Sequence, residues 1–250
     1  MTGPLYTLIT GASSGIGRET AVRLSPARRL ILHGRDSGRL EETLEMCQDP
    51  ERHLVWSFDL SAVERLAEAL PAVLAAPGGA VEALVHCAGM VTVLPARSLA
   101  PSAVRQIMNV NFFSAVELVR LLLQKKLNGR SLTGIVFVSS IWSRFGARAH
   151  SSYCASKAAL DGFMRALAVE LAPAVRVNSI LPGAIRTPLA EEALEDPAIA
   201  ARLDQDYPLG LGEAADVAKA IEFLLSPEAR WLTGQQIVLD GGRTINMSLK

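Results

Sequence analysis

The chain has 250 residues, half of them hydrophobic, and its 25 Lys and Arg residues balance its 25 Asp and Glu residues. This composition excludes an intrinsically disordered chain and supplies ample apolar material for a full core. Zero net charge, with no basic run, leaves no electrostatic footprint for nucleic acid or an anionic lipid surface, so we expect neither as a partner. Three cysteines, Cys47, Cys87 and Cys154, lack the spacing of a zinc site or a disulfide framework. Charges, prolines and glycines interrupt every long apolar window. We therefore expect a cytoplasmic protein with no metal site and no membrane span.

Short apolar runs recur along the sequence and are continuous rather than alternating, which is typical of strands buried on both faces. They predict strands at Leu5–Thr10, Leu30–His33, Leu54–Phe58, Ala83–His86, Gly134–Ser139, Val175–Leu181 and Gln236–Leu239. Between them, leucines and alanines at helical spacing predict helices at Ile16–Leu24, Arg39–Met46, Val63–Leu74, Ser102–Leu123, Ala155–Leu171 and Ala214–Leu225.

This alternation predicts an α/β fold, a doubly wound seven-stranded parallel sheet of the Rossmann type in a single domain spanning residues 1–250. In such sheets ligands bind at the carboxyl ends of the strands, so we expect the functional site there. The long irregular stretch after the sixth strand, about residues 184–212, is predicted to be a substrate lid.

A glycine turn follows the first strand and opens the first helix, with Gly11, Gly15 and Gly17 in order. Gly11 permits a sharp turn, Gly15 lets a phosphate approach the backbone, and Gly17 lets the helix pack closely. The turn predicts a pyrophosphate site, with an ordinary strand-to-helix turn as the alternative. Its spacing, G-x-x-x-G-x-G, differs from the usual G-x-G-x-x-G.

Tyr153 and Lys157 lie four residues apart at the start of a predicted helix, so their side chains share one face. A cation beside a phenol favours the phenolate, so we expect the pKa of Tyr153 to fall below its usual value of about 10. The pair could then act as a general acid/base. Ser140 closes the fifth strand with a hydroxyl that could polarise a carbonyl, and Asn111 lies within the fourth predicted helix. The alternative is a surface tyrosine covering a lysine stem.

Thr10–Gly17, which reads T-G-x-x-x-G-x-G, resembles the cofactor motif of the short-chain dehydrogenase/reductase family. Tyr153-Cys-Ala-Ser-Lys157, with Ser140 thirteen residues upstream, resembles that family's active-site sequence. Further matches, which extend the resemblance over essentially the whole chain, are Asn111, Pro182-Gly183 with Thr187, Leu232-Thr233-Gly234 and Asp240-Gly241-Gly242.

The resemblance implies a nicotinamide-dependent oxidoreductase that interconverts a ketone, or a 3-oxoacyl group, and a secondary alcohol. Tyr153 would transfer the proton and Ser140 would hold the substrate oxygen. Lys157 would lower the pKa of Tyr153 and bind the nicotinamide ribose, and Asn111 would position a water that relays protons to Lys157. The implied cofactor-binding residues are Thr10, Gly11, Ser13, Ser14, Gly15, Ile16, Gly17, Arg35, Asp59, Leu60, Ala88, Gly89, Tyr153, Lys157, Pro182, Gly183, Ile185 and Thr187.

The sequence departs from the family after the fourth strand, where Asn-Asn-Ala-Gly is replaced by His86-Cys87-Ala88-Gly89. Ala88 and Gly89 keep the small size that lets the backbone approach the cofactor. The amides that tie neighbouring strands together are lost, which puts stability in doubt more than catalysis. We interpret His86 and Cys87 as core residues at the strand end.

The end of the second strand favours NADP(H), because Gly34 occupies the family's acidic position and Arg35 follows with a guanidinium that suits a 2′-phosphate. NAD(H) stays possible. Ser14 stands where many NADP-dependent members carry a basic residue, and Asp36 could reach the ribose.

The segment between Ser140 and Tyr153 supplies the substrate-pocket candidates Trp142, Arg144, Arg148 and His150, with surface arginines and ordinary packing as alternatives. We expect a small-molecule carbonyl or alcohol substrate. The helices of the predicted fold carry more apolar positions than one buried stripe needs, and related proteins form tetramers, so we expect a homotetramer. A non-enzymatic nicotinamide-nucleotide-binding regulatory protein on the same fold is the alternative function, and the intact Asn111, Ser140, Tyr153 and Lys157 argue against it.

Overall fold

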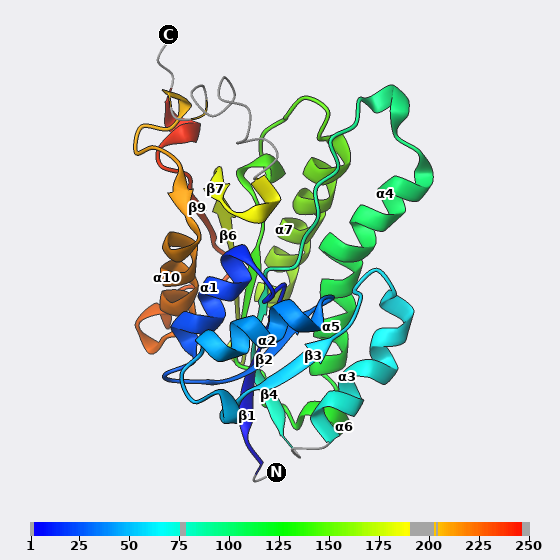
Figure 1. Ribbon diagram of the computed structural model, residues 1–250, viewed down its shortest axis with the longest axis vertical. Helices are drawn as coiled ribbons and strands as arrows, with labels where there is room; N and C mark the ends of the chain where they lie inside the picture. Colours follow the sequence, from blue (N-terminus) through cyan, green and yellow to red (C-terminus); the bar gives the residue numbers. More distant parts are fainter. Residues whose placement is uncertain (1–2, 76–78, 191–202, 204, 247–250) are drawn as a thin grey trace.

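The computed structural model describes residues 3–75, 79–190, 203 and 205–246. A parallel seven-stranded sheet runs through its centre in the order β3-β2-β1-β4-β5-β6-β9 (Figure 1). Its strands are β1 (Leu5–Thr10), β2 (Arg29–Gly34), β3 (Leu54–Ser57), β4 (Ala80–His86), β5 (Gly134–Val138), β6 (Arg176–Pro182) and β9 (Gln236–Leu239). The order reverses between β1 and β4, so the prediction of a doubly wound Rossmann-type domain is confirmed.

Helices cover both faces of the sheet. On one face pack α3 (Leu66–Ala75), α5 (Ser114–Leu122) and α7 (Ser151–Leu171), and on the other α1 (Gly15–Leu24), α2 (Ser37–Met46) and α10 (Ala214–Leu225). Neighbouring strand residues enter opposite cores: Leu8 packs in the first layer and Ile9 in the second, both fully buried. Burial of both faces explains why the strands are continuous apolar runs.

The helix predicted at Ser102–Leu123 is divided. It begins as α4 (Pro101–Met108), continues as the π-helical turn η4 (Asn109–Phe113) and ends as α5. The wider turn carries Asn111, whose side chain is fully buried. π-turns inside helices often mark functional sites, and apolar periodicity cannot reveal the one extra residue that they insert.

The first and last residues of the predicted lid lie side by side. Its first residues form β7 (Ile185–Arg186), which pairs in parallel with β8 (Gly212–Glu213) at its end. Two-residue strands have no readable periodicity, so the sequence did not predict this ladder. The middle of the segment, residues 191–202 and 204, lies outside the described residues, so the lid stays a prediction.

The remaining described elements are short. They are α6 (Lys125–Asn128), η1 (Pro50–Arg52), η2 (Val63–Arg65), η3 (Ala96–Ser98), η5 (Ile141–Ser143), η6 (Pro227–Ala229) and η7 (Arg243–Ile245). None of the helices in the described part of the chain combines the length and the apolar character needed to cross a bilayer.

Candidate active site

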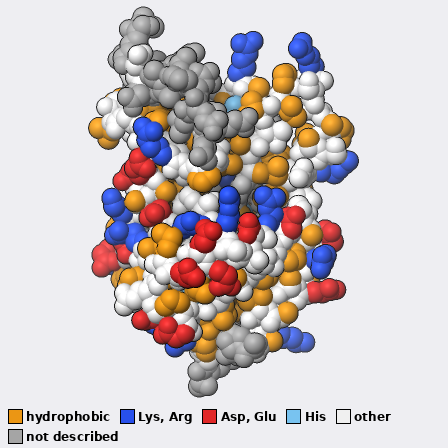
Figure 2. Space-filling view, in the orientation of Figure 1, with side chains coloured by type: hydrophobic (Ala, Val, Ile, Leu, Met, Phe, Trp, Pro, Cys, Tyr) orange, Lys and Arg blue, Asp and Glu red, His pale blue; other side chains and the backbone are white. Residues whose placement is uncertain are grey.

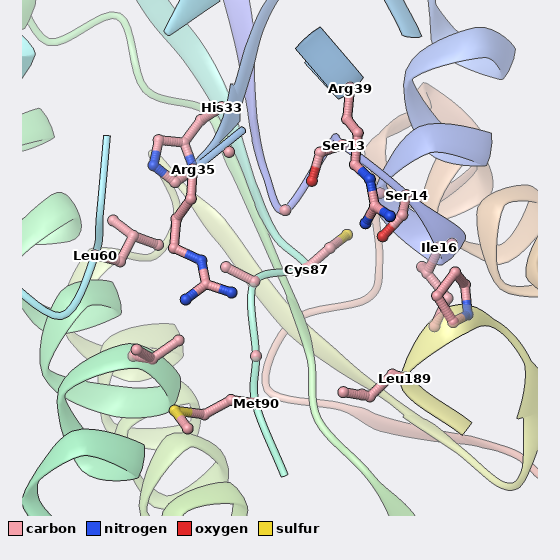
Figure 3. A pocket seen from close by; sticks show the side chains of 18 of the residues that line it. Ser13, Ser14, Ile16, His33, Arg35, Arg39, Leu60, Cys87, Met90 and Leu189 are labelled. Carbon is pink, nitrogen blue, oxygen red and sulfur yellow. The ribbon is translucent and has the colours of Figure 1, made fainter. Parts of the chain in front are cut away.

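A pocket of about 430 Å³ opens where the carboxyl ends of the parallel strands meet (Figure 3). Twelve of the predicted cofactor residues line it: Gly11, Ser13, Ser14, Gly15, Ile16, Gly17, Arg35, Asp59, Leu60, Ala88, Gly89 and Thr187. The sequence did not single out its other walls as cofactor contacts; these are His33, Gly34, Arg39, Cys87, Met90, Val110, Pro188 and Leu189. Thr10, Tyr153, Lys157, Pro182, Gly183 and Ile185, also predicted to bind the cofactor, are not part of its wall.

The glycine turn has the geometry that a phosphate cradle needs. Gly11 has a φ of +71°, and a Cβ there would stand 2.9 Å from the backbone of Ala88. A Cβ on Gly17 would collide with the Gly11 carbonyl. The turn leads into the amino end of α1, where Ser14 is the N-cap residue but its side chain makes no capping hydrogen bond. The free N–H groups of that first turn therefore face an anion-binding position.

The strand-tying role of the missing amides is taken over by His86. Its Nδ1 lies 3.0 Å from Thr10 Oγ1 on the neighbouring strand, and the same hydroxyl accepts a hydrogen bond from Ala88 N at 3.1 Å. Burial, with the Lys157 charge nearby, lowers the pKa of His86 to about 3, so its ring is neutral. The interpretation as a core residue holds for His86.

Cys87 differs from that interpretation. It is partly exposed and lines the pocket. Burial raises the pKa of its thiol to about 12, so the group presents a neutral, weakly polar surface. The structure thus corrects its assignment from core residue to pocket wall, a distinction that depends on the side-chain direction at the very end of β4.

A second hollow adjoins the pocket and is lined by Ser13, Arg35, Asp36 and Arg39. Arg35 and Arg39 enter from the end of β2 and from α2 (Figure 3). Within the described residues, neither guanidinium has a hydrogen bond or an ion pair. Glu42, a carboxylate on α2, is paired with Arg18 at 2.9 Å instead. Two unpaired cations at one rim suit a phosphate.

Asp36 is engaged elsewhere. Its Oδ1 accepts the backbone N–H of Arg39 at 3.1 Å and so caps α2. Sequence reasoning missed Arg39 as a pocket residue. The available signal was its spacing: a basic residue four positions after Arg35, in the first turn of a helix, lies at the same end of the sheet.

The four predicted catalytic residues come together from three elements and their ends. Tyr153 and Lys157 lie on the first turns of α7, Ser140 follows β5, and Asn111 lies on η4. Lys157 Nζ donates to the Val138 carbonyl at 2.9 Å and lies 5.7 Å from the centroid of the Tyr153 ring. All four side chains are buried or nearly so.

Asn111 is held firmly at this junction. Its Oδ1 accepts from Met90 N at 2.8 Å, and its Nδ2 donates to Met90 O at 3.0 Å and to Ser156 Oγ at 2.9 Å. A Cβ on Gly89 would stand 3.4 Å from Lys157 Nζ and 3.6 Å from Asn111 Oδ1. Asn111, Lys157 and the end of β4 therefore meet at one point.

The electrostatics of Tyr153 differ from the expectation. Burial raises the pKa of its phenol to about 12, although the Ser140 hydroxyl acts in the opposite direction. The Lys157 ammonium is bonded to a backbone carbonyl, and desolvation outweighs its attraction for a phenolate. The prediction of a lowered pKa is wrong for this arrangement: at neutral pH the phenol keeps its proton and can donate it.

The substrate-pocket candidates divide into two groups. The Trp142 ring stands edge-on to Tyr153 at 6.0 Å between centroids and lies 4.4 Å from His150, so it forms an aromatic wall beside the phenol. Arg144 is bonded to Gln236 Oε1 on β9 at 3.0 and 2.5 Å, and Arg148 is exposed. The structure thus brings Trp142 beside Tyr153, with His150 packed against Trp142.

A glycine turn shaped to receive a phosphate, a pocket at the carboxyl ends of the strands and a buried phenol near an ammonium are typical of dinucleotide-dependent oxidoreductases. The chain belongs to the short-chain dehydrogenase/reductase family. A family model described as enoyl-(acyl carrier protein) reductase matches residues 11–244.

Two curated relatives match along nearly their whole length. The D-erythrulose reductase of Gallus gallus is 35% identical over 239 residues, and the L-xylulose reductase of Bos taurus is 33% identical over 239 residues; each match covers 94% of both chains. Among solved structures, 4-hydroxyisoleucine dehydrogenase complexed with NADH superposes with a TM-score of 0.88 at 29% identity, covering 96% of this chain and 99% of that one.

Proposed function

We propose that the protein is an NADP(H)-dependent reductase of small ketones that interconverts a ketone and a secondary alcohol. The observation that supports this most is the buried Tyr153 phenol, which lies near Ser140 and Lys157 and whose pKa is raised by burial, so that it keeps its proton at neutral pH. A nicotinamide cofactor supplies the hydride when bound. The chain itself must provide the phosphate sites, the substrate position and the proton.

In reduction, Tyr153 donates its proton to the substrate oxygen, and Ser140 holds that oxygen by a hydrogen bond. Lys157 holds a positive charge beside the phenol, which stabilises the phenolate left after the transfer. Asn111 fixes the loop after β4 to α7. In this proposal it also positions a water that relays protons to Lys157. In oxidation the same groups act in reverse.

The preference for NADP(H) rests on Arg35 and Arg39. Their guanidinium groups, which have no partner within the described chain, would hold a 2′-phosphate at the second hollow, with Ser13 as a hydroxyl partner. Asp36, the alternative ribose partner, already caps α2. NAD(H) is the competing cofactor, because the similar structure of 4-hydroxyisoleucine dehydrogenase is complexed with NADH.

We further infer a polyhydroxylated ketone as the substrate class. The relatives named D-erythrulose and L-xylulose reductase act on such compounds. His150 Nδ1 lies 2.7 Å from the Arg148 carbonyl, which fixes the proton on Nδ1 and leaves Nε2 as an acceptor for a substrate hydroxyl. Trp142 would pack against the carbon chain. A 3-oxoacyl substrate is the alternative, suggested by the name of the matching family model.

We also propose a homotetramer in the cytoplasm. Val169 on α7 is 83% exposed, Trp231 before β9 is 90% exposed and Phe113 on η4 is 45% exposed, which is costly for an isolated chain. Burial between identical subunits would cover these surfaces. The three free cysteines fit a reducing compartment.

A screen of ketoses and 3-oxoacyl thioesters, with NADPH and then NADH, tests this function by the loss of reduced-cofactor absorbance. We expect turnover of a small ketose with NADPH. Absence of any turnover, combined with tight binding of NADPH by direct titration, would instead support the non-enzymatic nucleotide-binding protein.

A further inference from the structure

Asp161 is a buried carboxylate for which the proposed mechanism has no use. It lies on α7 with a side chain only 2% exposed. Both carboxylate oxygens are buried and, within the described residues, have no hydrogen-bond partner. Removing a carboxylate from water without a partner is strongly unfavourable, so such a group needs an electrostatic explanation.

The explanation lies one helical turn earlier, at Lys157. Residues four apart share a helix face, and Lys157 is 3% exposed. The hydrogen bond of its ammonium goes to the Val138 carbonyl, which carries no net charge. A buried cation and a buried anion therefore lie on the same stripe of α7, each lacking a direct ionic contact in the described structure.

The other groups around Lys157 cannot replace Asp161 as a counter-charge. His86, the last residue of β4, and Cys87, which follows it, are both neutral at working pH. Tyr153, on α7, keeps its proton, and Asn111 on η4 and Ser140 after β5 are uncharged. Among the described groups that surround Lys157, Asp161 is the carboxylate.

We propose that Asp161 is a positioning residue that keeps Lys157 in its charged form within the buried site. This inference rests on the proposed role of Lys157. Asp161 itself touches neither substrate nor cofactor in this account, and it acts through the charge it places behind the ammonium.

The direction of the titration agrees with this geometry. Burial lowers the pKa of Lys157 to about 8, and the Asp161 charge opposes that fall. Without the carboxylate, the ammonium would lose its proton at a still lower pH. The proposed ribose contact and the charge beside Tyr153 would then be missing in the neutral range.

A purely structural role for Asp161 makes a different prediction. Ser179 on β6 is also fully buried, and its Oγ has no hydrogen-bond partner within the described residues. The strand β6 packs against α7. Ser179→Ala is therefore a matched control, since it removes an unpartnered buried polar group from the same layer without changing a charge.

The first experiment measures NADPH affinity and turnover against pH for the unmodified protein, Asp161→Asn and Ser179→Ala. We expect the alkaline limb, which reports loss of the Lys157 proton, to move to lower pH by about one pH unit or more in Asp161→Asn. It should stay in place in Ser179→Ala. An unmoved limb in Asp161→Asn overturns the proposal.

The second experiment needs no activity and is a thermal cycle over Lys157→Met, Asp161→Asn and the double variant at pH 8. Lys157→Met leaves the carboxylate uncompensated and should lower Tm by roughly 6–12 °C, and adding Asp161→Asn should restore most of that loss. Additive losses overturn the proposal. If Asp161→Asn fails to fold while the double variant folds, the coupling is shown directly; failure of both contradicts it.

The two experiments separate this inference from the proposed function. A protein that reduces no ketone can still show the thermal coupling of Lys157 and Asp161. Conversely, if the protein reduces a ketone but its alkaline limb is unchanged in Asp161→Asn, the proposed function stands and the proposed role of Asp161 is wrong.

Discussion

The two ends of the site use charge in opposite ways. At the rim, Arg35 and Arg39 are exposed and have no partner in the described chain, so their charges are available to a ligand and screened by salt. In the interior, Tyr153, Lys157 and Asp161 are almost fully buried, and desolvation raises the pKa of Tyr153 and lowers that of Lys157. The space-filling view shows how basic and acidic side chains mingle over the exposed surface (Figure 2).

This difference teaches where each property of the enzyme can be altered. Recognition at the rim depends on direct contact with a ligand anion and can be changed by exchanging a surface side chain. The proposed proton transfer in the interior would depend on the whole buried layer, and a change there moves pKa values as well as contacts. The two ends should therefore respond independently to substitution.

The largest effect is expected in the interior. Tyr153→Phe removes the hydroxyl proposed to donate the proton and should lower turnover at least ~10²-fold, within the range of general acid/base catalysis. Steady-state kinetics with a ketose substrate measure this. Near-normal turnover in Tyr153→Phe would remove the phenol from the mechanism.

At the rim, Arg35→Ala should abolish most of the preference for NADPH over NADH. A charge-assisted contact contributes about 1.5–3 kcal/mol, which corresponds to a preference of roughly 10–150-fold. Fluorescence titration with both cofactors measures it, and Arg39→Ala should produce a smaller loss of the same kind. Arg165→Ala, exposed on α7, serves as the control and should leave the ratio unchanged. Tighter binding of NADH by the unmodified protein would contradict the assignment.

Introducing a carboxylate at the rim should reverse the preference. Gly34→Asp places a negative charge where the 2′-phosphate would lie and offers an acceptor to a free 2′-OH. A Cβ at this position comes 3.2 Å from the side chains of Leu40 and Ser13, so they must shift slightly. Gly34→Ala separates that steric cost from the charge: it should weaken both cofactors alike, whereas a reversal in Gly34→Ala would exclude the electrostatic explanation.

The pH dependence of the interior follows from Lys157. Its pKa of about 8 means that the ammonium is present below pH 8 and is lost as the pH rises above it. We therefore expect ketone reduction to decline above about pH 8, up to tenfold per pH unit, while Tyr153, with a pKa of about 12, stays protonated. A pH–rate profile at saturating NADPH tests this, and a rate that rises steadily to pH 10 would be inconsistent with it.

The smallest effect on activity concerns the strand tie beneath the site. His86→Ala leaves Thr10 without its cross-strand partner and should cost about 1–3 kcal/mol of unfolding free energy. His86→Asn should lose less, because an amide can make the same bond. Chemical denaturation measures both, with His150→Ala as a control in the loop. Equal stability of all three variants would show that the tie is dispensable.

The sequence predicted the sheet and the glycine turn because each has a local signal, and it predicted the four central residues because their motifs resemble those of a known family. Continuous apolar runs marked β1 to β6 and β9, and the spacing of Tyr153 and Lys157 placed both on one helix face. The π-turn at Asn109–Phe113 was missed because one inserted residue leaves the apolar pattern almost unchanged. The β7–β8 ladder was missed because two residues are too short to show a period.

Other features depend on the surroundings of a residue in the fold. The raised pKa of Tyr153 follows from its burial, which the adjacent residues in the sequence do not reveal. In the sequence Asp161 looks like an ordinary charged residue on a helix surface, and only the fold shows that it is buried one turn after Lys157. Arg39 lines the pocket because α2 begins next to the end of β2. Likewise, only the directions of the two side chains in the fold show that His86 lies in the core and Cys87 in the pocket wall.

The independence of the two ends is tested most directly by NADPH titration of Tyr153→Phe, Arg35→Ala and the double variant. We predict that Tyr153→Phe binds NADPH within about twofold of the unmodified protein, and that the loss caused by Arg35→Ala is the same in both backgrounds, as distant sites should behave. A double variant that departs from additivity by more than about 0.5 kcal/mol, or a Tyr153→Phe protein that no longer distinguishes NADPH from NADH, would contradict the account.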